Sequence, residues 1–392
     1  MTPFLMIGAR IRRRQMLQVG IAALAGPSVA RGQAADLPAL IRRTASPLAL
    51  EAPIDSFNTP ITAVERFFVR YNLPIIPTAA DLQSWSLKIG GDGAERNVTL
   101  SLDDLRGLPM REMVAVCQCA GNRRAMAMPP APGVQWGDGA MGCARWRGVR
   151  LRDVLLKAGV KSDTVEVAML GADSARNPDL APYAKSLPLE RAMDAGTLIA
   201  LEMNGAPLPL LHGFPARIIR PGWAGTYWVK HLTQLELRRK PLDTPFMTTE
   251  YRLPRGLFPV DRPFVTQEDG QTSPVTELVI NSLVTNLVSG DTVKLAGLVV
   301  QGVAWDGGSG VQSVEVSLDG GTHWKTALLG PDAGRFAFRL WRFPVLGIRP
   351  GALKLVVRAT GNDGQVQGER TRANPGGFFL NTTQKLNLVT TA

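Results

Sequence analysis

The sequence predicts two domains, an α+β region followed by an all-β sandwich. The chain has 392 residues, which exceeds the usual length of a single domain. Before about residue 252, strand-like and helical segments are mixed without the regular alternation of a βαβ fold or a Gly-rich dinucleotide fingerprint. From Leu253 onward, short strand-like segments alternate with Gly- and Asp-rich turns, which is typical of a β-sandwich.

Local patterns in the first region predict its individual elements. Ser101 and Asp104 stand at the N-cap and capping-box positions of a helix. Apolar residues at helical spacing predict a helix over Leu151–Ala158, and a proline in the first turn is typical of a short helix over Pro188–Met193. β-type runs predict three strands, over Ser84–Ile89, Met113–Cys117 and Thr164–Leu170.

The sandwich is predicted from short runs rich in β-branched and aromatic residues. These runs are Val275–Ile280, Thr292–Leu298, Gly302–Trp305, Val311–Leu318, Phe336–Trp341 and Lys354–Ala359. Two Gly-rich segments, Asp306–Gly310 and Asp319–Gly321, predict turns between them.

The first 34 residues have the composition of an export signal. A basic stretch at 10–14 precedes an apolar stretch at 16–25, which is too short to span a membrane. Arg13 and Arg14, with the residues after them, resemble a twin-arginine signal, and small residues before positions 31 and 35 offer cleavage sites. The resemblance implies export of a folded protein to the bacterial periplasm and no membrane span in the mature chain. An amphipathic anchor that stays in place is the alternative.

The formal net charge of +11 belongs partly to this leader. The other basic residues are dispersed, whereas nucleic-acid binding needs clustered Lys and Arg with stacking aromatic residues, so we expect no nucleic-acid partner. A mildly positive protein suits an anionic substrate or an acidic redox partner.

One cysteine segment has the composition of a metal site. A β-type run leads to Cys119, and a Gly-containing turn then places Arg123 and Arg124 after it. Positive charge biases a thiol towards the thiolate, the form that binds metals, and arginine pairs with small oxyanions. The alternative is a buried, inert cysteine followed by surface arginines. A disulfide between Cys117 and Cys119 would enclose one residue and be strained, so we expect Cys117 and Cys143 to be ordinary thiols.

The residues Gln118-Cys119-Ala120-Gly121-Asn122-Arg123-Arg124 resemble the molybdenum-cysteine segment of the sulfite oxidase family, whose enzymes carry a single molybdopterin. The resemblance implies that the Cys119 sulfur binds molybdenum directly. It also implies that Arg124 lines the substrate pocket.

Residues 65–74 resemble the family segment that ends in Phe-x-Arg-x-His. Arg70 takes the place of the arginine that contacts substrate and cofactor, and Phe68, Val69 and Tyr71 are implied to lie against the cofactor. Asn72 stands where the family has histidine, which is a departure from the pattern.

Two later segments resemble the pterin-binding elements of the family. His212 and Arg217 belong to a His-Gly-Phe-Pro-x-Arg element, in which the guanidinium has the geometry to hold a phosphate. The following loop, Pro221 to Lys230, implies cofactor contacts by Trp228, Val229 and Lys230.

Three single residues complete the implied site. Asp173 lies in a segment that corresponds to another pterin-side loop, and Trp136 matches a tryptophan that lines the family's pocket. Tyr251, between the predicted domains, takes the place of the active-site tyrosine. Packing in the core is the alternative role for Trp136 and Tyr251.

The resemblance covers nearly all of the chain after the leader, in the family's domain order. It implies a signal peptide at 1–34, a molybdopterin-binding catalytic domain with the sulfite oxidase fold at 36–252, and an immunoglobulin-like dimerisation-type domain at 253–392. A homodimer and a heterodimer with a cytochrome both stay open.

The implied activity is oxidation of sulfite to sulfate by oxygen-atom transfer, with one molybdenum of Mo-molybdopterin per chain. Arg70 and Arg124 are expected to bind sulfite, and Tyr251 to orient the oxygen ligand. The sequence has no Cys-x-x-Cys-His motif and no room for a cytochrome b5-type domain. We therefore expect no haem in this chain and electron transfer to a c-type cytochrome.

Two alternatives to sulfite oxidation stay open. The site of a family member can instead reduce a sulfoxide such as methionine sulfoxide, although those relatives lack the C-terminal sandwich. A cofactor-free β-sandwich scaffold protein is the alternative outside enzymology.

Overall fold

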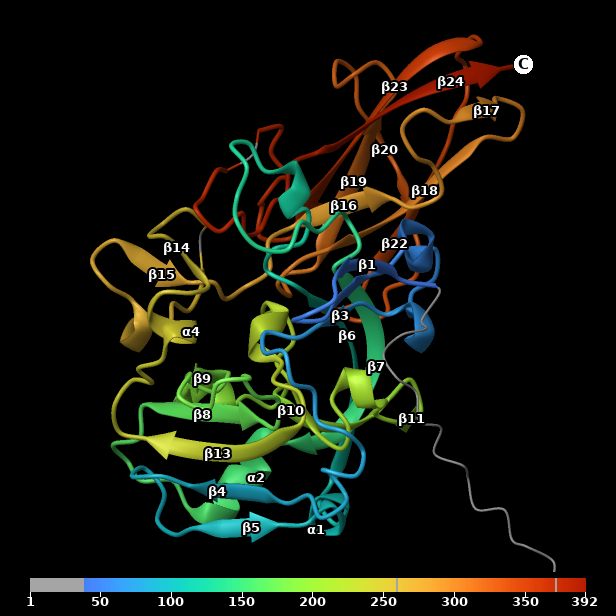
Figure 1. Ribbon diagram of the computed structural model, residues 1–392. Helices are drawn as coiled ribbons and strands as arrows, with labels where there is room; N and C mark the ends of the chain where they lie inside the picture. Colours follow the sequence, from blue (N-terminus) through green and yellow to red (C-terminus); the bar gives the residue numbers. More distant parts are fainter. Residues whose placement is uncertain (1–38, 259, 371) are drawn as a thin grey trace, which may run out of the picture. The chain divides into compact units, whose positions relative to one another are not determined.

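A computed structural model of the protein describes residues 39–258, 260–370 and 372–392, and strands predominate among them (Figure 1). An α+β part is followed by a β-sandwich, as the sequence predicts. The predicted signal peptide at 1–34 lies outside the described residues. Within the described ranges, no helix has both the length and the apolarity that crossing a membrane requires.

Two five-stranded sheets form the α+β part. The first has the order β5-β4-β13-β8-β9, from β4 (Leu87–Gly90), β5 (Val98–Leu100), β8 (Glu166–Gly171), β9 (Ala184–Pro188) and β13 (Leu232–Arg238). The second has the order β11-β10-β7-β6, with β12 also paired to β10, from β6 (Met110–Gln118), β7 (Met141–Arg150), β10 (Leu198–Met203), β11 (Ala206–Pro207) and β12 (Arg217–Ile219).

Short elements connect and flank these sheets. Two small sheets consist of β1 (Ile41–Thr44), β2 (Ala49–Glu51) and β3 (Val69–Arg70), and of β14 (Arg252–Pro254) and β15 (Thr272–Pro274). The α-helices are α1 (Leu102–Arg106), α2 (Leu151–Ala158), α3 (Leu189–Ala192) and α4 (Pro245–Thr248). The 3₁₀ turns are η1 (Ile54–Phe57), η2 (Val64–Arg66), η3 (Arg124–Met126), η4 (Leu210–His212), η5 (Gly225–Tyr227) and η6 (Val265–Gln267).

Helices α1 and α2 begin where the sequence predicts, α3 begins one residue after its predicted start at Pro188, and α4 was not predicted. The Ser101 side chain accepts a hydrogen bond from the Asp104 N–H, and the Asp104 carboxylate accepts one from the Ser101 N–H, so the capping box of α1 is formed. Helix α2 covers the predicted range and buries its apolar stripe, Leu151, Val154, Leu155 and Ala158.

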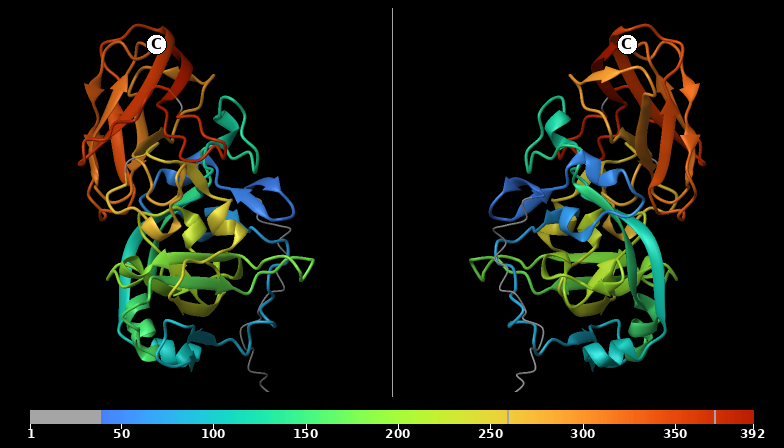
Figure 2. Two further views of the ribbon diagram at one scale, coloured as in Figure 1. Left: turned by 90° about the vertical axis from the view of Figure 1, so that its left-hand side faces the viewer. Right: turned by 90° about the vertical axis from the view of Figure 1, so that its right-hand side faces the viewer.

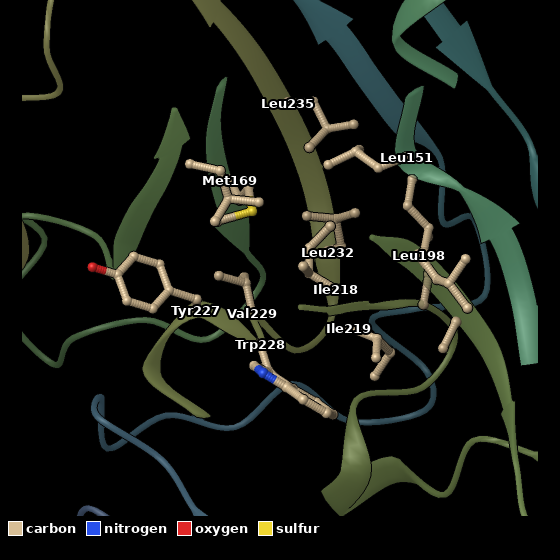
Figure 3. Packing of buried hydrophobic residues seen from close by; sticks show 14 of the residues in the cluster. Leu151, Met169, Leu198, Ile218, Ile219, Tyr227, Trp228, Val229, Leu232 and Leu235 are labelled. Carbon is tan, nitrogen blue, oxygen red and sulfur yellow. The ribbon is translucent and has the colours of Figure 1, made fainter. Parts of the chain in front are cut away.

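The core of the α+β part lies between its sheets and α2. Figure 3 shows Leu151, Met169, Leu198, Ile218 and Leu235 packed in this cluster. Tyr227, Trp228 and Val229 belong to the same cluster, although they come from the loop between β12 and β13. Core packing therefore fixes a loop that the sequence predicts to bind a cofactor.

The β-sandwich consists of two mainly antiparallel sheets (Figure 2). Apolar side chains from both sheets form a shared core. One sheet has the order β16-β18-β22-β21, from β16 (Asn281–Val284), β18 (Val299–Trp305), β21 (Leu328–Leu329) and β22 (Arg339–Pro344). The other has the order β17-β24-β23-β19-β20, from β17 (Thr292–Lys294), β19 (Val311–Ser317), β20 (Lys325–Thr326), β23 (Gly351–Gly361) and β24 (Gln384–Thr391).

One predicted strand of the sandwich is wrong. Val275–Ile280 is not a strand, and β16 begins only at Asn281. The backbone N–H groups of Val275 and Leu278 donate instead to the carbonyls of Tyr251 (2.8 Å) and Gly222 (2.8 Å). This alternating apolar segment therefore packs against residues that precede the sandwich.

Further contacts join the sandwich to the end of β6. The Val116 N–H donates to the Phe336 carbonyl over 2.8 Å, and the Phe379 N–H donates to the Ala120 carbonyl over 2.9 Å. The Trp305 indole N–H donates to the Gln118 side chain over 2.5 Å. The end of β6 is thus held from both parts of the chain, on either side of Cys119.

Candidate active site

A cavity partly open to solvent lies where β3, the end of β6 and the loops around η4 and η5 meet. Twelve of the fifteen site residues predicted from the sequence belong to this lining. The cavity therefore gathers residues that lie up to about 180 positions apart in the chain, from Arg70 to Tyr251.

Cys119 reaches the cavity from the end of β6. Its N–H donates to the Ala140 carbonyl and its own carbonyl accepts from the Asn122 N–H, both over 2.9 Å, so the backbone is fixed on either side of the thiol. The side chain is half-buried and lines the cavity. In the turn that follows, a Cβ on Gly121 would lie 2.4 Å from the Arg124 guanidinium, so a larger residue at this position would displace the arginine.

The other two cysteines have different surroundings. Cys117 also lines the cavity, because residues i and i+2 of a strand share a face. Burial raises the pKa of the Cys117 thiol to about 11, although Arg217 opposes the shift. Burial raises the pKa of the Cys143 thiol to about 12. Both therefore stay protonated at neutral pH, and the sequence did not predict that Cys117 lines the cavity.

The cavity has more basic than acidic lining residues. Arg70, Arg217 and Lys230 line it, and Asp173 is the sole carboxylate among the described lining residues. Burial lowers the pKa of Lys230 well below its ordinary value, and Arg217 adds to this effect. Burial raises the pKa of Asp173 to about 6, although Lys230 opposes the shift. An anionic ligand would relieve the repulsion between these buried cations.

Arg217 is held rigidly at the back of the cavity. Its guanidinium donates to the carbonyls of His212 (3.0 Å) and Trp228 (3.2 Å). It also lies 5.0 Å from the Trp146 ring centroid, within the range of a cation–π contact. Its Nε is buried and has no hydrogen-bond partner among the described residues, and the nearby Cys117 thiol opposes the lowering of the Arg217 pKa that burial causes.

Two buried histidines are neutral around the cavity. Burial, with the charges of Arg217 and Lys230, lowers the pKa of both His212 and His231 to about 3. The His231 Nδ1–H donates to the Phe214 carbonyl over 2.7 Å, so its Nε2 is left as the acceptor for the Tyr71 hydroxyl at 2.8 Å. Lys230 Nζ lies 3.0 Å from the Tyr71 ring centroid. His231 therefore positions Tyr71 from outside the lining.

Tyr251 and Asn72 meet at the cavity. The Tyr251 hydroxyl donates to the Asn72 side-chain oxygen over 2.6 Å, which joins two residues predicted from separate motifs. Burial raises the pKa of Tyr251, although Arg70 opposes the shift. The Tyr251 ring stacks on Phe378 of the C-terminal part, with ring centroids 5.7 Å apart. Tyr251 adopts a φ of 56°, a left-handed conformation that is strained for a bulky residue.

Three predicted site residues do not line the cavity. Val69 is buried in β3, and Trp136 is fully buried with its ring edge against Phe68. The Arg124 guanidinium donates to the carbonyls of Gly376 (2.8 Å) and Val134 (3.1 Å) and lies over the Phe378 ring. Arg124 thus lies behind Tyr251, since both contact Phe378, and its predicted contact with substrate stays a prediction.

The lining also contains residues that sequence reasoning missed. Tyr183 and Thr226 form one side of the cavity, where the Tyr183 hydroxyl lies 2.7 Å from both the carbonyl and the hydroxyl oxygen of Thr226. Thr226 lies within the Gly-rich loop that the sequence did single out. Tyr183 has no comparable local motif; it comes just before β9, and the pairing of β9 with β8 brings this end of the strand to the cavity.

Both parts of the chain match known protein families. Residues 73–246 match the oxidoreductase molybdopterin binding domain, and residues 272–382 match the Mo-co oxidoreductase dimerisation domain. The chain is 37% identical over 322 residues to sulfite oxidase of Gallus gallus, a match that covers 78% of this chain and 68% of that protein. It is 36% identical to mitochondrial sulfite oxidase of Homo sapiens, over 78% of this chain but 57% of that protein.

A solved structure matches nearly the whole chain. The sulfane dehydrogenase SoxCD from Paracoccus pantotrophus superposes with a TM-score of 0.74 at 26% sequence identity, covering 94% of this chain and 92% of that one. The relatives thus share both the α+β part and the sandwich, whereas the mitochondrial sulfite oxidases extend well beyond the matched region.

Proposed function

The chain belongs to the sulfite oxidase family of molybdopterin oxidoreductases, and on this basis we propose that it oxidises sulfite to sulfate in the bacterial periplasm. The observation that carries the proposal is the cavity itself, in which a half-buried thiol faces three cations and one carboxylate. Sulfite is a small oxyanion, and such a charge balance favours its binding.

The residues present fit Mo-molybdopterin. The Cys119 sulfur would hold the molybdenum, because it is the thiol at the cavity that the surrounding protein leaves half-exposed. Arg217, with its unpartnered Nε, and Lys230 would hold the phosphate of the pterin. His212 and Asp173 would supply further polar contacts. The bound cofactor supplies the oxygen-atom transfer and accepts two electrons from sulfite.

The remaining lining residues would act on the substrate. Arg70 would bind the sulfite oxygens by charge-assisted hydrogen bonds. The Tyr251 hydroxyl donates to the Asn72 oxygen over 2.6 Å in the structure, and it would turn this single hydrogen to an oxygen of the substrate or its product when one is bound. Asn72 stays neutral at every pH, so it contributes orientation without changing the charge of the cavity.

We take this chain to be free of haem. Electrons would therefore pass to a c-type cytochrome outside it. The match to the dimerisation domain supports assembly through the C-terminal sandwich, either with a second copy or in a complex with the cytochrome. The leader at 1–34 supports periplasmic export by the twin-arginine pathway.

Sulfane sulfur is a second candidate substrate. It is suggested by the solved sulfane dehydrogenase, whose fold matches 94% of this chain at 26% identity, while the sulfite oxidase of Macaca fascicularis is 38% identical over 78% of this chain. The two candidate substrates, sulfite and sulfane sulfur, differ in charge and size at the reacting sulfur. Their reactions can therefore be compared on one preparation of the protein.

The test begins with the metal content of the purified protein, for which we expect one molybdenum per chain. Sulfite added in the absence of oxygen should then reduce the molybdenum. Electron paramagnetic resonance should detect Mo(V), and an added c-type cytochrome should become reduced in turn. Molybdenum-loaded protein that is reduced by a persulfide but not by sulfite would select the second candidate. Folded protein that takes up no molybdenum would contradict both.

A further inference from the structure

A lysine is completely buried beside the candidate active site. Lys185 lies on β9, paired with Met169 of β8, and its exposed fraction is 0%. Among the residues that the structure describes, its hydrogen bond goes to a backbone carbonyl, and its ammonium group has no ion pair with a carboxylate. A buried ammonium without such a partner is unfavourable for folding and is found preferentially at functional sites.

The partners of Lys185 are a carbonyl and two aromatic rings. Its Nζ donates to the Phe246 carbonyl over 2.7 Å. The same atom lies 4.5 Å from the Tyr227 ring centroid and 5.2 Å from the Tyr251 ring centroid. Ring faces attract cations, and the attraction is strongest where water is excluded. Lys185 therefore contacts Tyr251 from the protein interior, while the Tyr251 hydroxyl bonds Asn72 at the cavity.

Tyr251 needs such contacts to keep its place. Its φ of 56° is a strained conformation for a tyrosine, and surrounding interactions have to hold it. The Asn72 oxygen holds the hydroxyl, Phe378 stacks on the ring, and Lys185 attracts the ring. Of these three, Lys185 alone offers a charge.

We propose that Lys185 is a positioning residue, which holds the Tyr251 ring through a cation–π contact so that the tyrosine hydroxyl stays directed at Asn72 and the cavity. The proposal rests on the proposed function only in so far as Tyr251 takes part in the reaction. The contact between the two side chains does not depend on it.

The contact is sensitive to pH. Burial and the charge of Arg252 lower the pKa of Lys185 to about 7, while Glu250 opposes the shift. The phenols of Tyr227 and Tyr251 also face it, and burial raises the pKa of each. The ammonium is thus present below about pH 7, and the attraction weakens as the pH rises through this value.

The test compares Lys185→Met with Lys88→Met, which removes an exposed lysine of β4. Loss of a desolvated cation–π contact should lower kcat/KM for sulfite roughly tenfold. The fall should lie in kcat, because Lys185 does not line the cavity. We expect Lys185 to cause an ionisation near pH 7 in the dependence of kcat on pH. This ionisation should disappear in Lys185→Met and persist in Lys88→Met. Unchanged kinetics in molybdenum-loaded Lys185→Met would overturn the proposal.

Stability and a double variant separate this role from a structural one. Lys185→Met removes a buried charge, so its melting temperature at pH 6 should equal or exceed that of the wild type. In a Tyr251→Phe background, Lys185→Met should lower kcat little further, since both changes affect the same hydroxyl. A lower melting temperature with normal kcat would assign Lys185 a structural role. If the protein does not oxidise sulfite at all, the proposed function fails, and absorbance titration of the Tyr251 phenol in both Lys185 forms still tests the contact.

Discussion

Single residues decide the chemistry at this cavity, and the three cysteines illustrate how. Cys117 lies in β6 and Cys143 in β7, where burial raises the pKa of the Cys117 thiol to about 11 and that of the Cys143 thiol to about 12. Cys119 lies just past the end of β6, where the chain enters a turn that contains Gly121. All three residues are cysteines, so it is the position just past the end of the strand that distinguishes Cys119, the proposed metal ligand, from the two buried cysteines.

Changing Cys119 to Ser should abolish sulfite oxidation while the protein stays folded, because one metal ligand is lost among several cofactor contacts. Cys143→Ser is the matched control, since that thiol lies outside the lining. Turnover and molybdenum content should be measured on both variants. Near-normal turnover by a molybdenum-loaded Cys119→Ser protein would refute the ligand assignment.

Asn72 gives a prediction at the place where the motif predicts a histidine. A histidine there would change charge near its ordinary pKa of about 6.5, whereas asparagine stays neutral. Asn72→His should therefore add an ionisation to the pH profile of kcat/KM and improve sulfite affinity at low pH, where the added charge is positive.

The Asn72→His measurement spans about pH 5 to 9, and the wild type supplies the baseline for ionisations that Asp173 and Lys185 cause. Asn387→His, at an exposed position of β24, is the control for an added histidine that is remote from the cavity. Superimposable profiles for the wild type and Asn72→His would mean that residue 72 does not act on the substrate.

The sequence predicted those site residues that short motifs identify. Arg70, Cys119, Arg217 and Lys230 all stand in recognisable segments, and all line the cavity. Tyr183 and Lys185 were missed because their roles come from the pairing of β9 with β8 and from packing against distant loops. Arg124 stands in the strongest motif, but its guanidinium donates hydrogen bonds to carbonyls of two other segments. No local sequence pattern indicates these partners.

Among the secondary-structure elements, locally determined ones were predicted best. The capping box of α1 and the apolar stripe of α2 are complete within single short segments. Val275–Ile280 has the alternation of a strand but donates to carbonyls of Gly222 and Tyr251, far away in the sequence. Alternation indicates which residues are buried, and the partner that buries them has to come from the three-dimensional structure.

The segment Gly376–Phe379 gives a prediction at the scale of elements. It belongs to the C-terminal part, yet the Gly376 carbonyl accepts from Arg124, and Phe378 contacts both Arg124 and Tyr251. Phe378→Leu keeps an apolar side chain but removes the ring, so sulfite turnover should fall several-fold, while stability should fall by less than the about 3–5 kcal/mol of a buried Phe→Ala change.

Phe343→Leu is the matched control for Phe378→Leu, because Phe343 is equally buried but packs inside the sandwich. Turnover and urea unfolding should be measured on both variants. Equal losses of turnover in the two would indicate a general effect of destabilisation, with no special role for the segment.

At the scale of the whole molecule, the site depends on contacts that cross the predicted boundary at residue 252. Phe336, Trp305 and Phe379 of the C-terminal part hold the end of β6 and the residues just after it by hydrogen bonds. Phe378, from the same part, stacks on the Tyr251 ring. The domain division at 36–252 and 253–392 stays a prediction. The contacts imply that the cavity forms fully only in the complete described chain.

Buried neutral histidine makes the stability of the molecule depend on acid. His231 is fully buried, and its pKa is lowered from 6.5 to about 3. Between these values the unfolded chain binds a proton that the folded protein excludes. The contribution to stability is therefore present above about pH 6.5 and is lost as the pH falls towards 3, by about 1.4 kcal/mol per pH unit.

His231→Asn removes this titration, and asparagine tolerates the left-handed φ of 49° at that position. The variant should be less stable than the wild type at pH 7.5, because the bond to the Tyr71 hydroxyl is lost. The difference should shrink as the pH falls from 6.5 to 4.5, as followed by urea unfolding. Asp173, whose pKa burial raises to about 6, shifts both proteins in the opposite direction and cancels in the comparison. His323→Asn, at an exposed turn, is the control. A difference between wild type and His231→Asn that stays constant with pH would show that His231 is not held neutral in the folded protein.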